Sequence, residues 1–207
     1  MKFSIIIPAH NAENYIRKAL DSIKSQSFKD YELIVVCDSC TDKTEFIARQ
    51  YGAITKNVQY HCDGPTRGVG LDMAQGEWVL FMDDDDWWLH EFVLEQLAER
   101  VGRQHEDIFC FAFIWKDIRY CSPASLPGGL YPAVWNKCWR RAFIGNTRFP
   151  AVKSISDWYF HTEMMRKNPR IAMWDMPMYY YNYLRPGSIS QKQGRTVEET
   201  KKQLENM

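Results

Sequence analysis

Four consecutive aspartates, Asp83 to Asp86, directly follow an apolar run at 77–82 (EWVLFM). Carboxylates this close repel one another strongly unless a positive charge lies among them. Side chains alternate in an extended segment, so we expect Asp83 and Asp85 to face one side and Asp84 and Asp86 the other. Two carboxylates on one side can bind Mg²⁺ or Mn²⁺. Capping of a helix that begins near Trp87 would explain one aspartate but not four, so the run favours a metal site.

Two further polar clusters follow apolar runs earlier in the chain. His10 and Asn11 come after the run at 3–8, and Asp38 and Asp42 come after the run at 32–37. The carboxyl ends of parallel strands meet at one edge of a sheet, where ligands bind. We therefore expect these clusters and the aspartates to share one site.

The elements that would position these clusters follow a repeating pattern in the first half of the chain. Apolar runs predict strands at 3–8, 32–37, 57–61 and 77–82, and helical spacing predicts helices within 12–28, after Asp42 and around 92–101. A glycine-bearing segment, 64–70, leads into a short helix that ends at Gly76. Alternation of strand and helix predicts an α/β fold, with a mostly parallel, Rossmann-like central sheet covered by helices on both faces.

The pattern changes beyond Gly102. We expect a strand at 108–115, a loop at 122–129, a helix at 157–167 and an aromatic-rich segment at 171–183. Our interpretation is a single domain over 1–190. Residues 1–102 would bind a nucleotide, 103–190 would form a smaller region for the second substrate, and 191–207 would be a charged tail.

Composition limits the kind of protein. The 207 residues suit one domain, and 26 basic and 26 acidic side chains cancel, so net charge gives no general reason to expect nucleic acid as a partner. The longest apolar run, at 108–115, is too short to span a bilayer, and the first residues lead straight into a predicted strand, so we expect no signal peptide. We expect no integral membrane segment and a cytoplasmic location, free or peripheral at the membrane.

The six cysteines fit a reducing compartment better than a disulfide framework. Cys37 and Cys40 form a C-x-x-C pair, but the ligands that would complete a zinc site, His61 and Cys62, are adjacent rather than spaced. The pattern does not favour zinc.

A series of short motifs spans nearly the whole chain. They are IIIPAHN at 5–11, DSIKSQ at 21–26, ELIVV at 32–36, AQGE at 74–77, FMDDDD at 81–86, WNK at 135–137, SD at 156–157 and YYYNYLRPGS at 179–188. In this order and spacing they resemble the family-2 glycosyltransferases of the GT-A fold. The resemblance implies an inverting sugar transfer from a nucleotide-diphosphate sugar, usually a UDP-sugar, to a hydroxyl acceptor, with Mn²⁺ or Mg²⁺ as cofactor.

The resemblance also assigns residue roles. Asp157 would be the catalytic base that deprotonates the acceptor, Asp38 would read the base, and Arg67 would lie near the diphosphate. Asp83 and Asp85 would bind the metal, and Lys137 and Arg185 would contact the diphosphate or the acceptor. The residues that would border the nucleotide-sugar are Pro8, Ala9, His10, Asn11, Asp38, Arg67, Asp83 and Asp84.

Several positions depart from the family pattern. Cys37 and Ser39 stand where the family has Asp and Gly, and Ser156 stands where it has Glu. Cys40 replaces the Ser that ends the family's run at 37–40, and the Asn that usually follows two places after Arg67 is missing. The departures at Cys37 and Ser39 bear on which base is bound, and they keep open a non-catalytic module that only binds a nucleotide-sugar.

Two other expectations remain open. A sugar nucleotidyltransferase would also need metal-bound carboxylates on an α/β sheet. It typically carries a glycine-rich basic loop after the first strand, where this chain has PAHN at 8–11. The acceptor expected from the family is a surface polysaccharide or lipid-linked glycan. Because the chain is short for the family, we expect a partner or self-association to complete the acceptor site.

Overall fold

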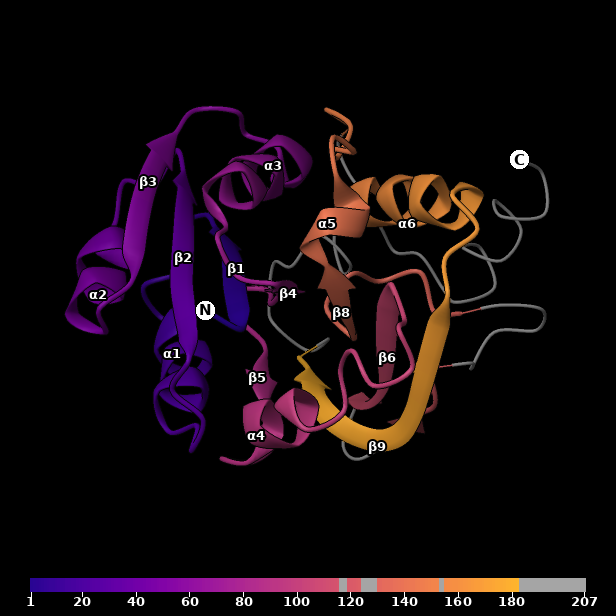
Figure 1. The fold of residues 1–207 in the computed structure, drawn as a ribbon. Helices are drawn as coiled ribbons and strands as arrows, with labels where there is room; N and C mark the ends of the chain where they lie inside the picture. Colours follow the sequence, from indigo (N-terminus) through magenta and orange to yellow (C-terminus); the bar gives the residue numbers. More distant parts are fainter. Residues whose placement is uncertain (116–118, 124–129, 153–154, 183–207) are drawn as a thin grey trace.

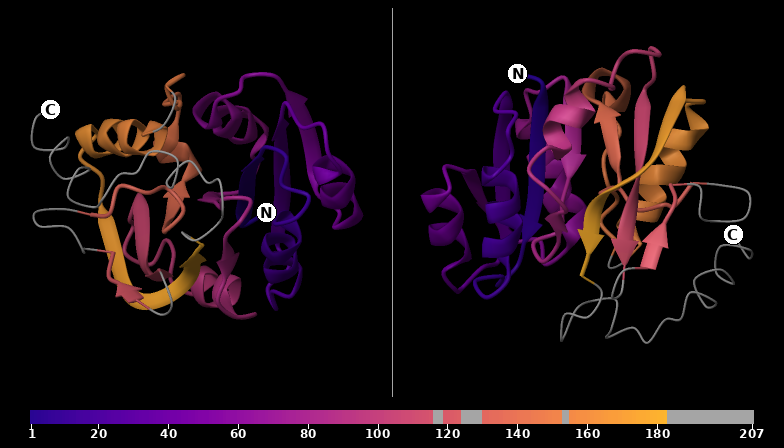
Figure 2. Two further views of the ribbon diagram at one scale, coloured as in Figure 1. Left: turned by 180° about the vertical axis from the view of Figure 1, so that it is seen from behind. Right: turned by 90° about the horizontal axis from the view of Figure 1, so that it is seen from below.

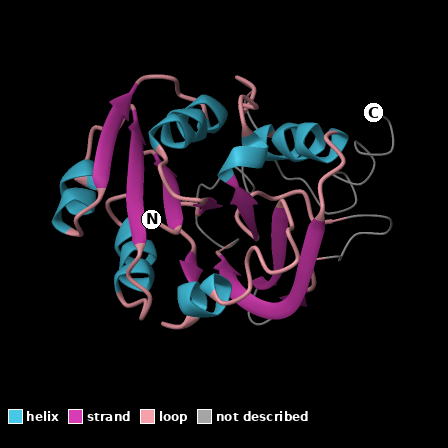
Figure 3. Ribbon diagram, viewed as in Figure 1, coloured by secondary structure: helices cyan, strands magenta, loops and turns pink. Residues whose placement is uncertain are grey.

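The computed structural model describes residues 1–115, 119–123, 130–152 and 155–182, so Arg185 and the tail at 191–207 lie outside the described residues. The first half alternates strand and helix as predicted (Figures 1 and 3). Its elements are β1 (Phe3–Ala9), α1 (Ile16–Lys24), β2 (Tyr31–Asp38), α2 (Thr44–Gln50), β3 (Ile54–Val58), α3 (Asp63–Met73), β4 (Trp78–Phe81), β5 (Trp87–Trp88) and α4 (Val93–Ala98).

In its described residues the second half adds four strands and two helices. It lies beside the first half along the sheet (Figures 1 and 2). Its elements are β6 (Ile108–Trp115), β7 (Arg119–Cys121), β8 (Lys137–Arg140), α5 (Arg141–Ile144), α6 (Ser156–Arg166) and β9 (Ile171–Tyr181).

One sheet runs through both halves, in the order β3-β2-β1-β4-β8-β6-β9-β5, with β7 beside β6. The strands β1 to β4 are parallel, whereas β8 is antiparallel to both β4 and β6. The predicted α/β fold is confirmed: β1 to β4 form a continuous parallel block, whereas the second half is mixed, because β9 is parallel to β6 and β8 is antiparallel to it. Because β2 and β4 flank β1 on opposite sides, the strand order reverses at β1, and open α/β sheets bind ligands at such a reversal.

Helices cover both faces of the sheet because β1 is apolar on both. Ile5 and Ile7 pack with α1, α2 and α4 on one face, and Ile6 packs with α3, α5 and α6 on the other. A strand buried on both faces has a continuous apolar sequence instead of an alternating one, which is why the apolar run at 3–8 indicated a strand.

Two local predictions were wrong. Glycines 64–70 belong to α3, where Gly70 lets the helix approach β1, because a Cβ there would collide with Ile6. The strand expected at 57–61 lies at Ile54–Val58, an edge strand with no buried residue and therefore a weak signal.

The helix expected around 92–101 is found as α4 at Val93–Ala98. Trp87 starts β5, which pairs with β9, so the aspartates have no helix at Trp87 to cap, and the capping alternative is excluded.

None of the helices in the described ranges is both long and apolar enough to cross a bilayer.

Candidate active site

The aspartates at 83–86 form a turn between β4 and β5. The backbone N–H of Asp86 donates to the carbonyl of Asp83 at 3.2 Å, so the segment is not extended. The expected extended conformation is therefore wrong, but burial alternates along the turn: Asp83 and Asp85 are half-buried while Asp84 and Asp86 are buried. The more exposed pair is the one that we expect to bind a metal.

The two buried aspartates are held by hydrogen bonds from other elements. Asp84 Oδ2 accepts from the backbone N–H of His10 at 3.2 Å, which joins the turn to the end of β1. Asp86 accepts from the Tyr179 hydroxyl at 2.6 Å and from the backbone N–H of Asn182 at 2.8 Å. Burial, reinforced by the charges of Asp83 and Asp85, raises the pKa of Asp86 well above its usual range.

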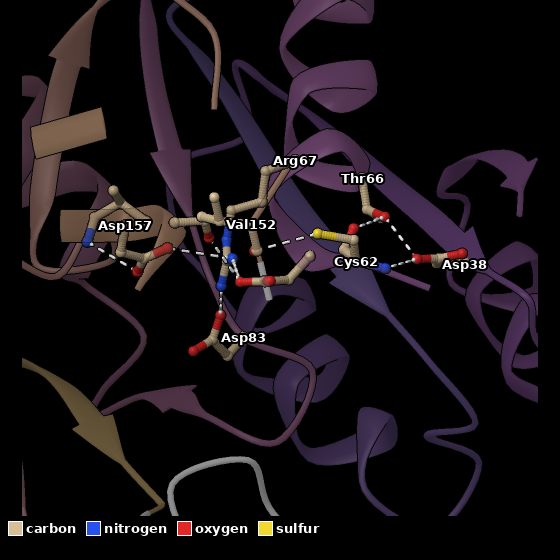
Figure 4. A network of polar contacts seen from close by, with 10 residues as sticks. Asp38, Cys62, Thr66, Arg67, Asp83, Val152 and Asp157 are labelled. Atoms are coloured by element: carbon tan, nitrogen blue, oxygen red, sulfur yellow. Dashed lines mark hydrogen bonds and ion pairs between the residues drawn. The ribbon is translucent and has the colours of Figure 1, made fainter. Parts of the chain in front are cut away.

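Arg67 is the positive charge that the acidic turn requires. Its side chain, 5% exposed, extends from α3 and pairs with Asp63, with Asp83 at 2.7 Å and with Asp157 at 3.2 Å (Figure 4). Burial alone would favour the neutral guanidine, but the three carboxylates outweigh it and raise the pKa of Arg67 well above the usual value. Arg67 therefore joins the acidic turn to α6 in the second half.

Asp157 lies in the first turn of α6, with 23% of its side chain exposed. Its Oδ2 accepts from the backbone N–H of Val134 at 3.5 Å. Burial raises its pKa to about 6 despite the opposing charge of Arg67, and Asp83 and Asp63 add to the increase. A carboxyl that titrates near 6 is ionised at neutral pH and retains more basicity than an ordinary aspartate, which suits a general base.

Hydrogen bonding around Arg67 is incomplete. Arg67 Nε is buried and makes no hydrogen bond to any described residue, and Asp157 Oδ1, also buried, has its ion pair with Arg67 but no hydrogen bond to the described residues. Buried polar atoms are nearly always satisfied, so the unpartnered Arg67 Nε is consistent with a site that awaits a polar ligand.

Asp38 anchors the start of α3 to the end of β2. One carboxylate oxygen accepts from the N–H groups of Tyr60 at 2.8 Å and His61 at 2.9 Å, and the other from the N–H of Cys62 at 2.9 Å and the Thr66 hydroxyl at 3.0 Å (Figure 4). Burial opposes ionisation, but these donors lower the pKa of Asp38 overall. Its carboxylate is directed at the chain itself, and a contact with a base stays a prediction.

The segment Pro8–Asn11 lies beside Asp38. Pro8 and Ala9 pair with β2, and the Asp38 carbonyl accepts from His10 Nδ1 at 2.6 Å, which places the proton on that nitrogen. Asn11 adopts a left-handed φ of 47°, which asparagine tolerates, and its side-chain oxygen accepts from the N–H of Thr41 at 2.8 Å. The ends of β1, β2 and β4 therefore meet, as the sequence predicted.

Lys137 is fully buried at the start of β8. Its ammonium donates to the carbonyls of Tyr131 at 2.5 Å and Ala133 at 2.6 Å and to Asn136 Oδ1 at 2.7 Å, and burial lowers its pKa to about 8. It thereby secures the segment whose Val134 N–H reaches Asp157. The predicted contact of Lys137 with a diphosphate or acceptor stays a prediction.

Sequence reasoning missed two side chains of this site. Asp63 lies one helical turn before Arg67, a spacing that would have indicated the ion pair had the segment been assigned to a helix. Tyr179 contacts the acidic turn from 96 residues away in sequence, and no local pattern indicates such a contact.

A family model described as Glycosyl transferase family 2 matches residues 4–120. The chain belongs to this family. The predicted resemblance is thus confirmed, and the aspartates and Arg67 fall inside the matched region while Asp157 lies beyond it.

Two bacterial relatives extend this family-2 assignment. Glycosyltransferase GlyA of Streptococcus pneumoniae is 26% identical over 91% of this chain and 31% of its own length. The poly(ribitol-phosphate) β-N-acetylglucosaminyltransferase TarS of Staphylococcus aureus is 35% identical over 52% of this chain and 20% of its own length. The chain therefore spans less than a third of either relative.

Solved structures of GT-A glycosyltransferases share the fold of this chain. S. aureus TarS 1–349 in complex with UDP-GlcNAc superposes with a TM-score of 0.82 at 27% identity, covering 92% of this chain and 61% of that one. Glucosyl-3-phosphoglycerate synthase from Mycobacterium tuberculosis, in complex with Mn²⁺ and UDP, shares the fold at 18% identity, with a TM-score of 0.70 over 99% of this chain and 78% of that one.

The residues of this family-2 chain fit a divalent cation that is bound partly by protein carboxylates and partly by the substrate. Among the described residues no three His, Cys, Asp or Glu side chains converge into a ready-made metal cluster. Mg²⁺ usually binds through one or two carboxylates plus substrate phosphates, so the half-buried Asp83 and Asp85 supply a suitable protein contribution.

A separate cavity of about 410 Å³ lies between α1, α2 and β2, with Ile23, Tyr31 and Tyr51 in its wall. None of the candidate site residues lines it, so we assign it no part in the chemistry.

Proposed function

We propose that the chain is a metal-dependent, inverting glycosyltransferase that moves a sugar from a UDP-sugar to a hydroxyl acceptor in the synthesis of a cell-surface glycan or polysaccharide. Family membership supports transfer, and the TarS complexes with UDP and UDP-GlcNAc support the donor class. The observation that carries the proposal is Arg67, whose guanidinium contacts both Asp83 and Asp157. One arginine side chain would therefore link the acidic turn, on the proposed leaving-group side, to Asp157, the proposed base.

In the proposed reaction Asp157 takes the proton of the acceptor hydroxyl. The acceptor oxygen forms a bond to the anomeric carbon, while the bond from that carbon to the phosphate oxygen breaks and its electron pair leaves with UDP. Attack opposite the leaving group inverts the anomeric configuration. The Val134 N–H and Arg67 orient the Asp157 carboxylate, and the raised pKa of Asp157 keeps it basic enough to act.

Asp83 and Asp85 are the residues that would hold Mn²⁺ or Mg²⁺. When bound, the cation would neutralise the charge that grows on the diphosphate as it leaves. Arg67 adds a second, permanent positive charge beside Asp83. Pro8 to Asn11 and Asp84 would border the nucleotide-sugar at the ends of β1 and β4.

The remaining partners are also part of the proposal. The acceptor would be a glycan or lipid-linked sugar, bound over the second half of the chain. Self-association and a cytoplasmic location stay predictions.

Product analysis tests the reaction class. The protein is incubated with a panel of UDP-sugars and Mn²⁺, with and without glycan acceptors, and UDP and pyrophosphate are quantified separately. We expect UDP release that is lost with EDTA and restored by Mn²⁺. The variant Asp157→Asn should retain UDP binding and lose turnover. Release of pyrophosphate would indicate a nucleotidyltransferase, and donor binding without turnover in the unmodified chain would indicate a non-catalytic module.

A further inference from the structure

The hydroxyl of Tyr179 connects both ends of the acidic turn to β9. It donates to Asp86 Oδ2 at 2.6 Å and accepts from the backbone N–H of Asp83 at 3.1 Å. The turn is also closed internally, by the N–H of Asp86 on the carbonyl of Asp83. One phenol oxygen therefore fixes the backbone from which the Asp83 and Asp85 side chains extend.

Asp86 accepts the hydrogen bond from the Tyr179 hydroxyl and has no contact with solvent. It is fully buried, and its second oxygen accepts from the N–H of Asn182 at 2.8 Å. No ion pair joins Asp86 to a cationic side chain in the described part of the protein. Its carboxylate is thus occupied by neutral donors from β9 and the residue that follows it.

The ring of Tyr179 is itself immobilised. It is fully buried and stacks on Trp135 with ring centres 4.7 Å apart and planes 7° apart. Its backbone pairs with Trp88 of β5, directly after the turn. A phenol held on three sides presents its hydroxyl at a fixed point, which is what a positioning residue requires.

We propose that Tyr179 and Asp86 form a positioning pair that sets the geometry of the cation site, and that Asp86 is not itself a metal ligand. The inference rests on the proposed function and deepens it. Within the acidic turn it separates Asp83 and Asp85, which bind the cation, from Asp86, which shapes the turn. Cation binding then depends on a strand that is distant in sequence from the acidic turn.

The first test removes only the hydroxyl. Mn²⁺ binding in the presence of saturating UDP is measured by the electron paramagnetic resonance signal of free Mn²⁺. Tyr179→Phe keeps the stack on Trp135 and leaves the Asp83 N–H without its acceptor, and we expect Mn²⁺ affinity to fall about tenfold or more. Tyr180→Phe is the matched control, because the neighbouring tyrosine stacks on Trp87 and loses the same group without touching the turn. It should bind Mn²⁺ as the unmodified protein does.

The second test separates shaping from ligation, and it stands even if Tyr179→Phe fails to fold. Asp86→Asn keeps the side-chain shape and an acceptor for the Asn182 N–H, and its new NH₂ group can donate to the Tyr179 hydroxyl oxygen, which still accepts from the Asp83 N–H. Mn²⁺ affinity should therefore change by no more than about threefold. Asp85→Asn should abolish binding.

The outcomes distinguish this inference from the proposed function. Equal affinity in Tyr179→Phe and the unmodified protein would overturn the inference alone, as would equal losses in Tyr179→Phe and Tyr180→Phe. A loss in Asp86→Asn as large as that in Asp85→Asn would make Asp86 a ligand and also overturn it. Failure of the unmodified protein to bind Mn²⁺ with UDP would overturn the metal-dependent function and the inference together.

Discussion

Among single residues, Arg67 determines how the candidate site is organised. Its buried guanidinium contacts carboxylates from its own helix, from the acidic turn and from α6. Removing one partner from a buried charge cluster leaves the others uncompensated, which is usually more costly than the pairing itself is stabilising. The site is therefore stable only while a positive charge lies among these aspartates.

A substitution at Arg67 tests this dependence. Arg67→Met should lower the free energy of unfolding by about 3 kcal/mol, because the carboxylates then repel one another. Arg49→Met is the matched control. Arg49 pairs with Glu45 on a helix surface and is 65% exposed, so its loss should cost about 0.5 kcal/mol or less. Urea denaturation at pH 7 measures both, and equal losses in the two variants would contradict the account.

The pH dependence of transfer follows from Asp157. The proposed base works only when deprotonated, and its pKa is raised to about 6. The rate should therefore be constant above pH 7 and should fall as pH drops through about 6, approaching tenfold per pH unit below it. Initial rates between pH 5 and 8 provide the measurement, and binding of UDP with Mn²⁺ at each pH separates loss of the base from loss of donor binding. A rate that stays constant down to pH 5 would show that another group is the base.

Among the elements, α3 has the largest part in shaping the site. It carries Asp63 and Arg67, its preceding N–H groups bind Asp38, and it packs directly on β1. Its position depends on Gly70, where a Cβ would collide with Ile6. The close approach of this helix is what brings Arg67 to the ends of β1 and β4.

Two glycines of α3 give opposite predictions. Gly70→Ala should destabilise the protein by about 1 kcal/mol or more, because the added methyl overpacks the contact with β1. At Gly68 a Cβ meets no atom within 4 Å, so Gly68→Ala should stabilise by about 0.5 kcal/mol through helix propensity. Thermal unfolding of both variants is the measurement, and a stabilising Gly70→Ala would refute the close packing of α3 on β1.

Across the whole molecule, sequence alone located the strands that are buried, such as β6, predicted at 108–115 and found there. It misplaced β3, because an edge strand lacks the apolar signal that burial requires. The meeting of the β1, β2 and β4 ends was predictable, since parallel topology dictates it. Asp157 was not predictable from spacing, because an aspartate in the first turn of a helix usually only stabilises that helix. The family resemblance singled it out, and its pairing with Arg67 depends on long-range packing.

The whole molecule also explains why the site needs both halves. The first half carries the acidic turn and Arg67, while the second supplies Asp157, the Val134 N–H and Tyr179. The antiparallel β8 joins the halves edge to edge through β4. The proposed base and the proposed leaving-group side come from opposite halves, an arrangement that would let both face the same sugar.

The most direct test is the position of Mn²⁺ in crystals grown with UDP, located from its anomalous scattering. We predict one Mn²⁺ at the acidic turn, bound by Asp83, by Asp85 and by diphosphate oxygens, with Asp157 facing the diphosphate and not bound to the metal. A metal bound by Asp157, or UDP bound away from the ends of β1 and β4, would contradict the proposed division between leaving-group side and base side.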